Sequence, residues 1–276
     1  MRKKMHLLGS ISKHIFTYAL LALFMVPFYL MVINSFKTTQ AFISDPFALP
    51  ASIGFANYVL AFERMNFLNA FANSLVITVI SVMLILITSA MSAYFLVRFN
   101  WKINKIIFAI FVASMIVPFQ AVMIPLVSIY GGLELLNNRW ILIFMYAGFG
   151  QAFAVFIFHG FVKNIPLEIE EAATIDGCGR LQTFFKIVLP MLMPVVSTVL
   201  ILNVLWIWND FLLPSLILIS PAQRTLPLST FSFFMAFSVD LAPLMAGIVL
   251  TILPVLAVYL ICQRQIISGI VQGAVK

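Results

Sequence analysis

The chain has 276 residues, of which 63% are hydrophobic and only 9% are charged, and its formal net charge is +7. A soluble domain usually has about 25% charged residues, so this composition excludes a chain that covers itself with polar surface and indicates one that lies in lipid. The positive charge does not indicate a nucleic-acid partner, because the basic residues lie at the ends of apolar stretches, as orientation signals of membrane proteins do.

Six apolar stretches predict an all-α polytopic membrane protein, with residues 1–276 forming a single transmembrane domain. The first stretch is longer than the apolar core of a signal peptide, about 7–15 residues, and we interpret it as a retained span. The third stretch is expected to break at Pro118 and Pro125. The predicted spans are Ile15–Ile33, Leu68–Val97, Ile106–Tyr130, Trp140–Phe161, Met191–Ile219 and Leu241–Cys262.

Lysine and arginine are distributed unequally between the two sides of these spans. One side has twelve of them, and the other has only Lys37, Arg64, Arg139 and Arg224. Basic residues accumulate on the cytoplasmic side of membrane proteins. The asymmetry therefore predicts that both termini and the loop between the fourth and fifth spans face the cytoplasm.

That loop, Ile165–Pro190, has the pattern of a short surface helix followed by a turn and a second amphipathic piece. Pro166 suits a first helical position, and the acids that follow it suit the positive end of the helix dipole. Gly177 is expected to end the helix in a left-handed conformation. Within the predicted helix Pro166–Asp176, one face is formed by Ile169, Ala172, Ala173 and Asp176.

The loop resembles the EAA loop of ABC importer permeases. The resemblance is carried by Glu171-Ala172-Ala173, Asp176-Gly177, Phe184, Ile187 and Leu189-Pro190. It implies that a cytoplasmic ATPase docks on Glu171, Ala172, Ala173, Asp176 and Gly177. The alternative interpretation is an ordinary amphipathic loop between two spans.

The most polar sequence inside a predicted span is Trp206-Ile207-Trp208-Asn209-Asp210. A charged group within a bilayer is costly, so it normally faces a bundle interior or a water-filled path. Aromatic faces and a carboxylate suit a polyhydroxylated solute, and Trp206, Trp208, Asn209 and Asp210 are therefore candidate path residues. An aromatic belt at the outer membrane surface, with a solvated acid, is the alternative.

Further motifs are similar to the carbohydrate branch of ABC importer permeases, and within it to the maltose-type second permease subunit. They are Asn73-Ser74, Ala93-Tyr94 followed by Arg98, Pro118 with Pro125, Trp208-Asn209-Asp210, and the tail Gly269 to Lys276, which ends in Gly273-Ala274-Val275-Lys276. The resemblance implies a type I importer fold in a bacterial or archaeal cytoplasmic membrane. It also implies a second homologous permease, two cytoplasmic ATP-binding subunits and an extracytoplasmic solute-binding protein. Related branches carry other solutes such as glycerol phosphates.

The sequence has no phosphate-binding G-x-x-x-x-G-K-[ST] loop, no metal-ligand spacing and no catalytic constellation. We therefore expect no cofactor and no enzymatic activity in this chain. A secondary transporter driven by an ion gradient is the rival from another class, but it needs coupling-ion sites near the middle of the membrane. A requirement of uptake for ATP rather than for an ion gradient would discriminate the two.

Overall fold

The computed structural model describes residues 2–234 and 239–274, and it describes the side chains of residues 13–234, 239–261 and 263. Within these ranges the chain is helical, and a bridge between Phe234 and Val239 is the one pairing of strand type. Val275 and Lys276 of the tail motif lie outside the described residues, as do the side chains of Arg2, Lys3, Lys4 and Arg264, which belong to the charge asymmetry.

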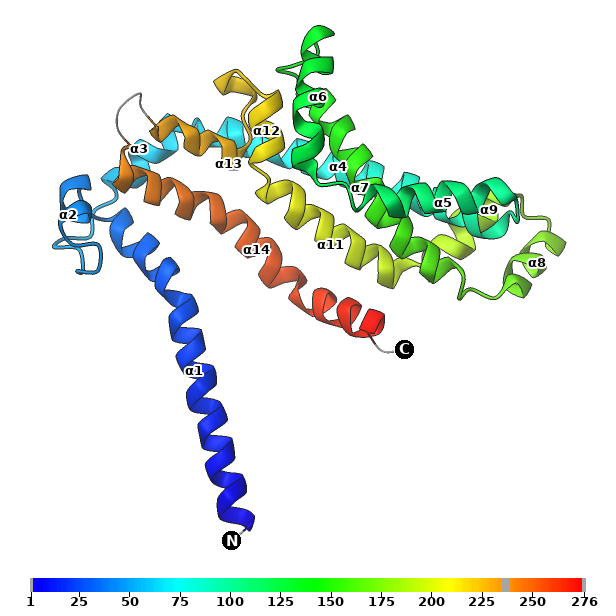
Figure 1. Cartoon of the computed structure of the whole chain (residues 1–276), viewed down its shortest axis with the longest axis horizontal. Helices are drawn as coiled ribbons and strands as arrows, with labels where there is room; N and C mark the ends of the chain where they lie inside the picture. The colour runs from blue at the N-terminus through cyan, green and yellow to red at the C-terminus, as the bar shows by residue number, and fades with distance from the viewer. Residues whose placement is uncertain (1, 235–238, 275–276) are drawn as a thin grey trace. The chain divides into compact units, whose positions relative to one another are not determined.

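The chain forms two compact units, both drawn in Figure 1. The first consists of Met1–Phe67 and Thr230–Leu253, and the second consists of Leu68–Ser229 and Pro254–Lys276. The helices of the first unit are α1 (Arg2–Ser35), α2 (Thr39–Ser44), α3 (Ala56–Arg64), η3 (Thr230–Phe233) and the first part of α14 (Leu241–Ala274).

Polar contacts hold the loop after α1 within the first unit. The ammonium of Lys37, which is only 6% exposed, donates to the carbonyls of Asp45 and Pro46 at 2.9 and 3.3 Å. Arg64 forms an ion pair with Asp240 at 2.9 Å. The region between the first two predicted spans therefore contains two short helices and a hydrogen-bonded turn, which its mixed hydropathy does not predict.

The second unit contains most of the apolar core. Its longer helices are α4 (Phe67–Arg98), α5 (Lys102–Ser114), α6 (Phe119–Gly132), α7 (Arg139–Val162) and α11 (Met193–Asn209). Its shorter helices are α8 (Leu167–Ile175), α9 (Arg180–Thr183), η1 (Phe184–Val188), α10 (Leu189–Met191), α12 (Leu212–Ile217), η2 (Pro221–Gln223) and α13 (Leu226–Ser229). Helix α7 packs against both α5 and α11, and this contact buries Phe158 and Val155 completely. The core of this unit therefore lies along α7.

Four helices are long and apolar enough to cross a membrane, and two bent pairs raise the number of candidate spans to six. The four are in α1, α4, α7 and α14, where spans are predicted. The bent pairs correspond to the predicted third and fifth spans, neither of which is one straight helix.

The predicted third span bends by 99° between α5 and α6. Pro118 precedes α6 in an extended conformation. Proline has no amide hydrogen and disfavours helical geometry in the residue before it, so a helix does not continue into Pro118 from the preceding residues. Pro125 lies inside α6, and the helix continues through it. The prediction of a break is therefore confirmed at the first proline and wrong at the second.

The predicted fifth span, Met191–Ile219, is not one continuous helix. A bend of 77° at Leu192 separates the short helices before it from α11, next to Pro190 and Pro194. Helix α11 ends at Asn209, because Asp210 is extended with φ −70° and ψ 131°. Asp210 therefore lies at a helix end rather than inside a helical span.

Close packing of α7 against α4 and α11 depends on Gly150. A methyl group at this position would overlap Ile85 Cδ1, which is fully buried, and would lie 3.2 Å from Asn203 Oδ1. We expect Gly150→Ala to destabilise the chain by about 1–3 kcal/mol through overpacking. The measurement is the thermal midpoint of the protein in mild detergent.

Gly148 is the matched control for this substitution, because it lies on the same helix and nothing lies within 4 Å of an added methyl group. Gly148→Ala should leave the midpoint unchanged or raise it slightly. Equal midpoints for Gly150→Ala and the unmodified protein would contradict the packing argument.

Candidate functional site

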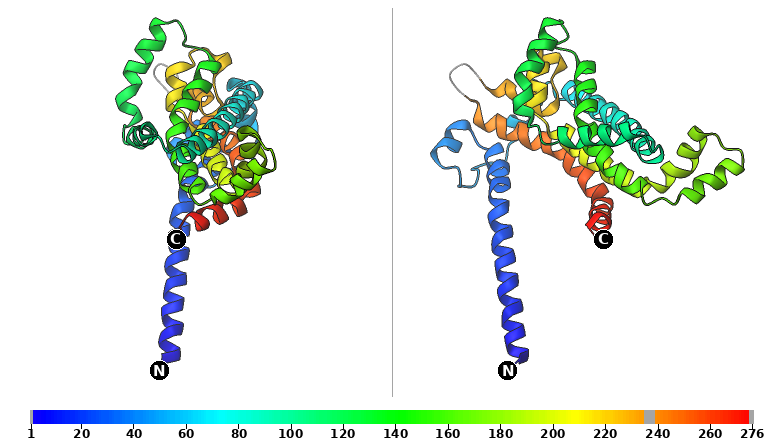
Figure 2. Two further views of the ribbon diagram at one scale, coloured as in Figure 1. Left: turned by 90° about the vertical axis from the view of Figure 1, so that its right-hand side faces the viewer. Right: turned by 45° about the vertical axis from the view of Figure 1, so that its right-hand side comes forward.

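The loop after α7 folds into the short helix α8, which Figure 1 and the right-hand view of Figure 2 place at one end of the second unit. Pro166 precedes the helix rather than forming its first residue, a difference of one position from the prediction. Gly177 has φ +84°, so the predicted left-handed conformation is confirmed. The amide of Gly177 donates to Thr174 O at 3.1 Å and that of Cys178 to Ala173 O at 2.9 Å. These two bonds form a Schellman motif that ends α8.

A buried ion pair anchors α8 to the end of α4. Arg98 Nε lies 2.6 Å from Glu170 Oε1, and the two side chains are only 13% and 8% exposed. The hydroxyl of Tyr94 donates to the other carboxylate oxygen at 2.7 Å, and Arg98 Nη2 donates to Ile165 O at 2.9 Å. Both oxygens of Glu170 are therefore satisfied, which a buried carboxylate needs.

The structure divides the predicted docking residues between two faces of α8. Ala173 is 5% exposed and lies on the buried side with Glu170. Glu171, Ala172, Asp176 and Gly177 are exposed. The predicted common face of Ile169, Ala172, Ala173 and Asp176 is therefore wrong for Ala173, because the helix turns that side chain toward its own subunit.

Glu170 is the residue of this region that the sequence analysis missed. Three glutamates stand in the first turns of the predicted helix, and dipole arguments treat them alike. The only signal was that Tyr94 and Arg98 are spaced i, i+4 at the end of a span, where one acid could satisfy both.

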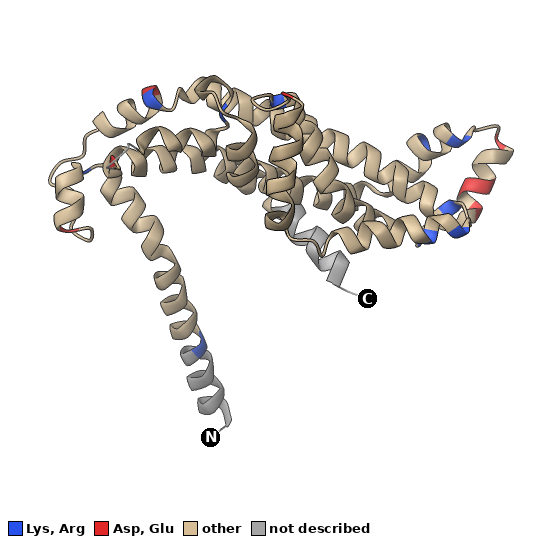
Figure 3. Cartoon of the chain, turned by 45° about the horizontal axis from the view of Figure 1, so that its top comes forward, with Lys and Arg blue, Asp and Glu red and all other residues tan. Residues whose placement is uncertain are grey.

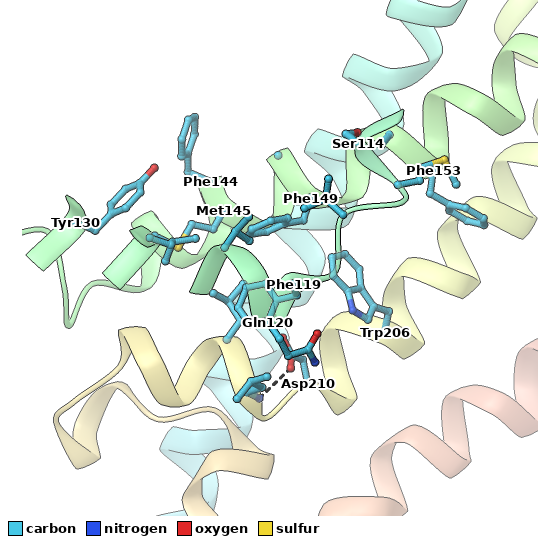
Figure 4. Close-up of a pocket in the computed structure, with 18 residues that line it drawn as sticks. Ser114, Phe119, Gln120, Tyr130, Phe144, Met145, Phe149, Phe153, Trp206 and Asp210 are labelled. Atoms are coloured by element: carbon cyan, nitrogen blue, oxygen red, sulfur yellow. Dashed lines mark hydrogen bonds between the residues drawn. The ribbon is translucent and has the colours of Figure 1, made fainter. Parts of the chain in front are cut away.

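The predicted path residues lie at the C-terminal end of α11, next to a cavity of about 900 Å³. Its lining residues come mainly from α6 and α7, and Trp206 of α11 and the start of α12 complete the wall, as Figure 4 shows. They include Ser114, Phe119, Gln120, Tyr130, Phe144, Phe149, Trp206 and Asp210. One carboxylate and no lysine or arginine line this cavity among the described residues.

Asp210 is held in place by two hydrogen bonds. The hydroxyl of Tyr146 donates to Oδ2 at 2.9 Å, and the amide of Leu212 donates to Oδ1 at 3.0 Å. Tyr146 is fully buried and its ring contacts Trp206 edge to face, with 5.6 Å between the centroids. The carboxylate is therefore fixed in orientation at the cavity wall, beside an indole that is 42% exposed.

Of the four predicted path residues, the structure brings two to the cavity. Trp206 and Asp210 line it, whereas Trp208 is buried against Phe71 with 5.7 Å between the ring centroids. Asn209 is exposed, and its amide donates to Leu205 O of its own helix at 2.7 Å. Sequence reasoning missed Tyr146, Gln120 and Tyr130, whose polar groups in or next to apolar helices were the available signal.

Removing the Glu170 carboxylate should release α8 from α4. Glu170→Ala leaves a buried guanidinium without its partner, at a cost of about 3 kcal/mol. We expect trypsin cleavage after Lys163 and Arg180 in the detergent-purified complex to become about a hundredfold faster, if opening of the loop limits cleavage. Glu168→Ala removes an exposed acid from the same helix and should leave the rate unchanged. Equal rates in the two variants would contradict the anchoring role.

Residues 85–271, more than half of the chain, match the family model of the binding-protein-dependent transport system inner membrane component. The chain is 42% identical over 269 residues to a probable starch degradation products transport system permease protein of Thermoanaerobacterium thermosulfurigenes, covering 96% of this chain and 98% of that protein. It is 34% identical to a melibiose/raffinose/stachyose import permease protein of Bacillus subtilis, with 91% of each covered.

Among solved structures, the chain is similar to one in a bacterial ABC transporter involved in the import of the acidic polysaccharide alginate. The TM-score is 0.81 at 23% identity, and the match covers 93% of this chain and 96% of that chain. At this identity the likeness shows the fold, which is that of a type I ABC permease.

Proposed function

The chain belongs to the family of inner membrane components of binding-protein-dependent transport systems, as a permease subunit of an ABC importer, and we propose that it forms half of the path for a neutral oligosaccharide. The observation that carries this proposal is the aromatic cavity at the end of α11, with the carboxylate of Asp210 fixed in its wall. Indole and phenyl faces stack on sugar rings, and a fixed carboxylate accepts hydrogen bonds from sugar hydroxyls.

The charge of the cavity supports a neutral solute over a glycerol phosphate. Its lining in the described part of the chain has one acid and no basic side chain, so a phosphate group would meet like charge without a partner. The printed names of two relatives refer to starch degradation products and to melibiose, raffinose and stachyose. Both observations support a sugar or oligosaccharide as the solute.

The rival proposal, a transporter driven by an ion gradient, receives no support from this cavity. Coupling-ion sites use several buried acids or unwound helices near mid-membrane. Among the described residues, Asp210 is the one acid that lines the cavity, and both of its oxygens accept hydrogen bonds from the chain itself. Dependence on a binding protein, which defines the family, also supports ATP-driven import.

The proposed topology has six spans, with each bent pair crossing the membrane once and with both termini in the cytoplasm. The distribution of lysine and arginine supports this orientation, and residues 1–276 then form a single permease domain. The proposed assembly contains a second homologous permease, two cytoplasmic ATP-binding subunits and an extracytoplasmic solute-binding protein. ATP hydrolysis takes place on the partner subunits.

We further propose that the exposed side of α8 seats in an ATP-binding subunit. The side chains available there are those of Ala172, Glu171 and Asp176, and Gly177 lets the chain turn away directly after the helix. The ion pair between Arg98 and Glu170 then transmits movement of the ATP-binding subunit to α4. A helix that is fixed to α4 on one side and exposed on the other suits docking of a partner subunit.

Substitutions of two neighbouring alanines distinguish a loss of docking from a loss of stability. Ala172→Asp places a charge on the exposed side, so we expect the permease to keep its thermal midpoint while it loses the ATP-binding subunit. Ala173→Asp places a charge inside the subunit and should lower the midpoint itself. The measurements are subunit stoichiometry after purification and the midpoint of the permease. Wild-type stoichiometry and solute-stimulated hydrolysis in Ala172→Asp would exclude the docking role.

The path is tested by uptake in sealed vesicles that contain the whole importer. We expect Asp210→Ala and Trp206→Ala each to lower oligosaccharide uptake about tenfold, through loss of a hydrogen bond to a charged group and of a stacking surface. Hydrolysis of ATP without solute should stay near the wild-type rate. Asn209→Ala is the matched control, because this amide bonds to its own helix and does not line the cavity.

If Asn209→Ala lowers uptake as much as Asp210→Ala, the path does not follow this cavity. If neither Asp210→Ala nor Trp206→Ala changes the uptake of any sugar tested, the aromatic belt is the correct interpretation.

A further inference from the structure

A second cavity, of about 350 Å³, lies where the end of α4, the start of α5 and the end of α7 meet. Its lining residues are separate from those of the cavity at Asp210. Its polar lining residues are Asn100, Trp101, Asn104, Lys105, His159 and Lys163. No acidic side chain lines it in the described part of the chain.

The two lysines of this cavity form no ion pair with a carboxylate of the described residues. Among the residues that the structure describes, the carboxylates in ion pairs are those of Asp240 and Glu170, which bind Arg64 and Arg98. Lys105 and Lys163 are exposed at the surface and approach the same hollow from α5 and from the end of α7. Figure 3 shows most of the basic residues of the second unit at this end. The lining of the hollow therefore has two positive charges and no acid among the described residues.

Asn104 adds an unsatisfied polar group to the wall of the cavity. The side chain is 3% exposed, and its amide nitrogen donates to Phe99 O at 2.6 Å. Its Oδ1 is buried without a hydrogen-bond partner in the described structure. Buried carbonyl oxygens are nearly always paired, so an unpaired one in a residue that lines a cavity is unusual.

The remaining lining has the chemistry of a membrane surface. Leu96, Val97 and Phe108 form apolar walls, and the indole of Trp101 is 55% exposed beside them. Tryptophan prefers the boundary between lipid and water, and basic pockets between transmembrane helices bind anionic head groups. The ends of α4 and α7, two candidate spans, place the cavity at that boundary.

We propose that this cavity binds the head group of phosphatidylglycerol. Its phosphate lies between the ammonium groups of Lys105 and Lys163, which both line the cavity. The apolar walls accommodate the start of the acyl chains. A head group with an amine would bring a positive charge close to the two lysines.

The test is the dissociation constant of phosphatidylglycerol for the purified, delipidated importer complex, measured by native mass spectrometry in mild detergent. Phosphatidylcholine serves as the neutral comparison lipid, and we expect it to bind at least tenfold more weakly than phosphatidylglycerol. Lys105→Gln and Lys163→Gln should each weaken phosphatidylglycerol binding about fivefold. Lys102→Gln is the matched control, because Lys102 lies at the same helix start but does not line the cavity, and it should change the constant less than twofold.

A second kind of variant keeps both lysines and adds a negative charge to the lining of the cavity. Asn100 is exposed, so Asn100→Asp should fold normally and should weaken binding of phosphatidylglycerol by like-charge repulsion. Equal constants for the two lipids, or equal constants in Lys105→Gln, Lys163→Gln and Lys102→Gln, would overturn the proposal. Displacement of the lipid by inorganic phosphate at constant ionic strength would overturn the lipid assignment and make this a site for soluble phosphate.

Discussion

The position of α8 on the second unit depends on one buried ion pair, that between Arg98 and Glu170. Without it, α8 would be a nine-residue helix on a loop, too short to be stable alone in water. In the pair each charge compensates the other, whereas either charge alone would be costly to bury. Tyr94 donates to the remaining carboxylate oxygen of Glu170. The ion pair thereby fixes a surface loop to the end of α4, which is the contact that the proposed docking mechanism needs.

Helix α7 lies between the proposed docking loop and the cavity. It packs against α5 and α11, and the hydroxyl of Tyr146 in its first half donates to Asp210. The loop that contains α8 begins directly after α7, so one helix joins the two proposed functional regions through the packed core of the unit. Gly150 allows the close approach of α7 to its neighbours. In the proposed mechanism, α7 is the element through which a shift of the loop reaches the wall of the cavity.

Hydropathy and charge predicted the existence and type of the long helices, because a bilayer requires about 20 apolar residues whatever their order. Patterns with a local cause were also predictable, such as the left-handed Gly177 and the break at Pro118. What could not be predicted depends on contacts between distant residues. The partners Arg98 and Glu170 are 72 positions apart, and nothing local distinguishes Glu170 from the exposed glutamates beside it.

One error had a cause that the sequence already contained. Residues i and i+2 of an α-helix point in directions about 200° apart, so Trp206 and Trp208 could not both face one path while α11 remained helical. The structure resolves this by directing Trp206 to the cavity and Trp208 to Phe71. Asp210 follows Trp206 by four positions, which is the same side of a helix, and it reaches the cavity although the helix ends one residue earlier. Termination at Asn209 frees the backbone after the acid to turn, so that Leu212 N can bind the carboxylate and fix it at the cavity wall.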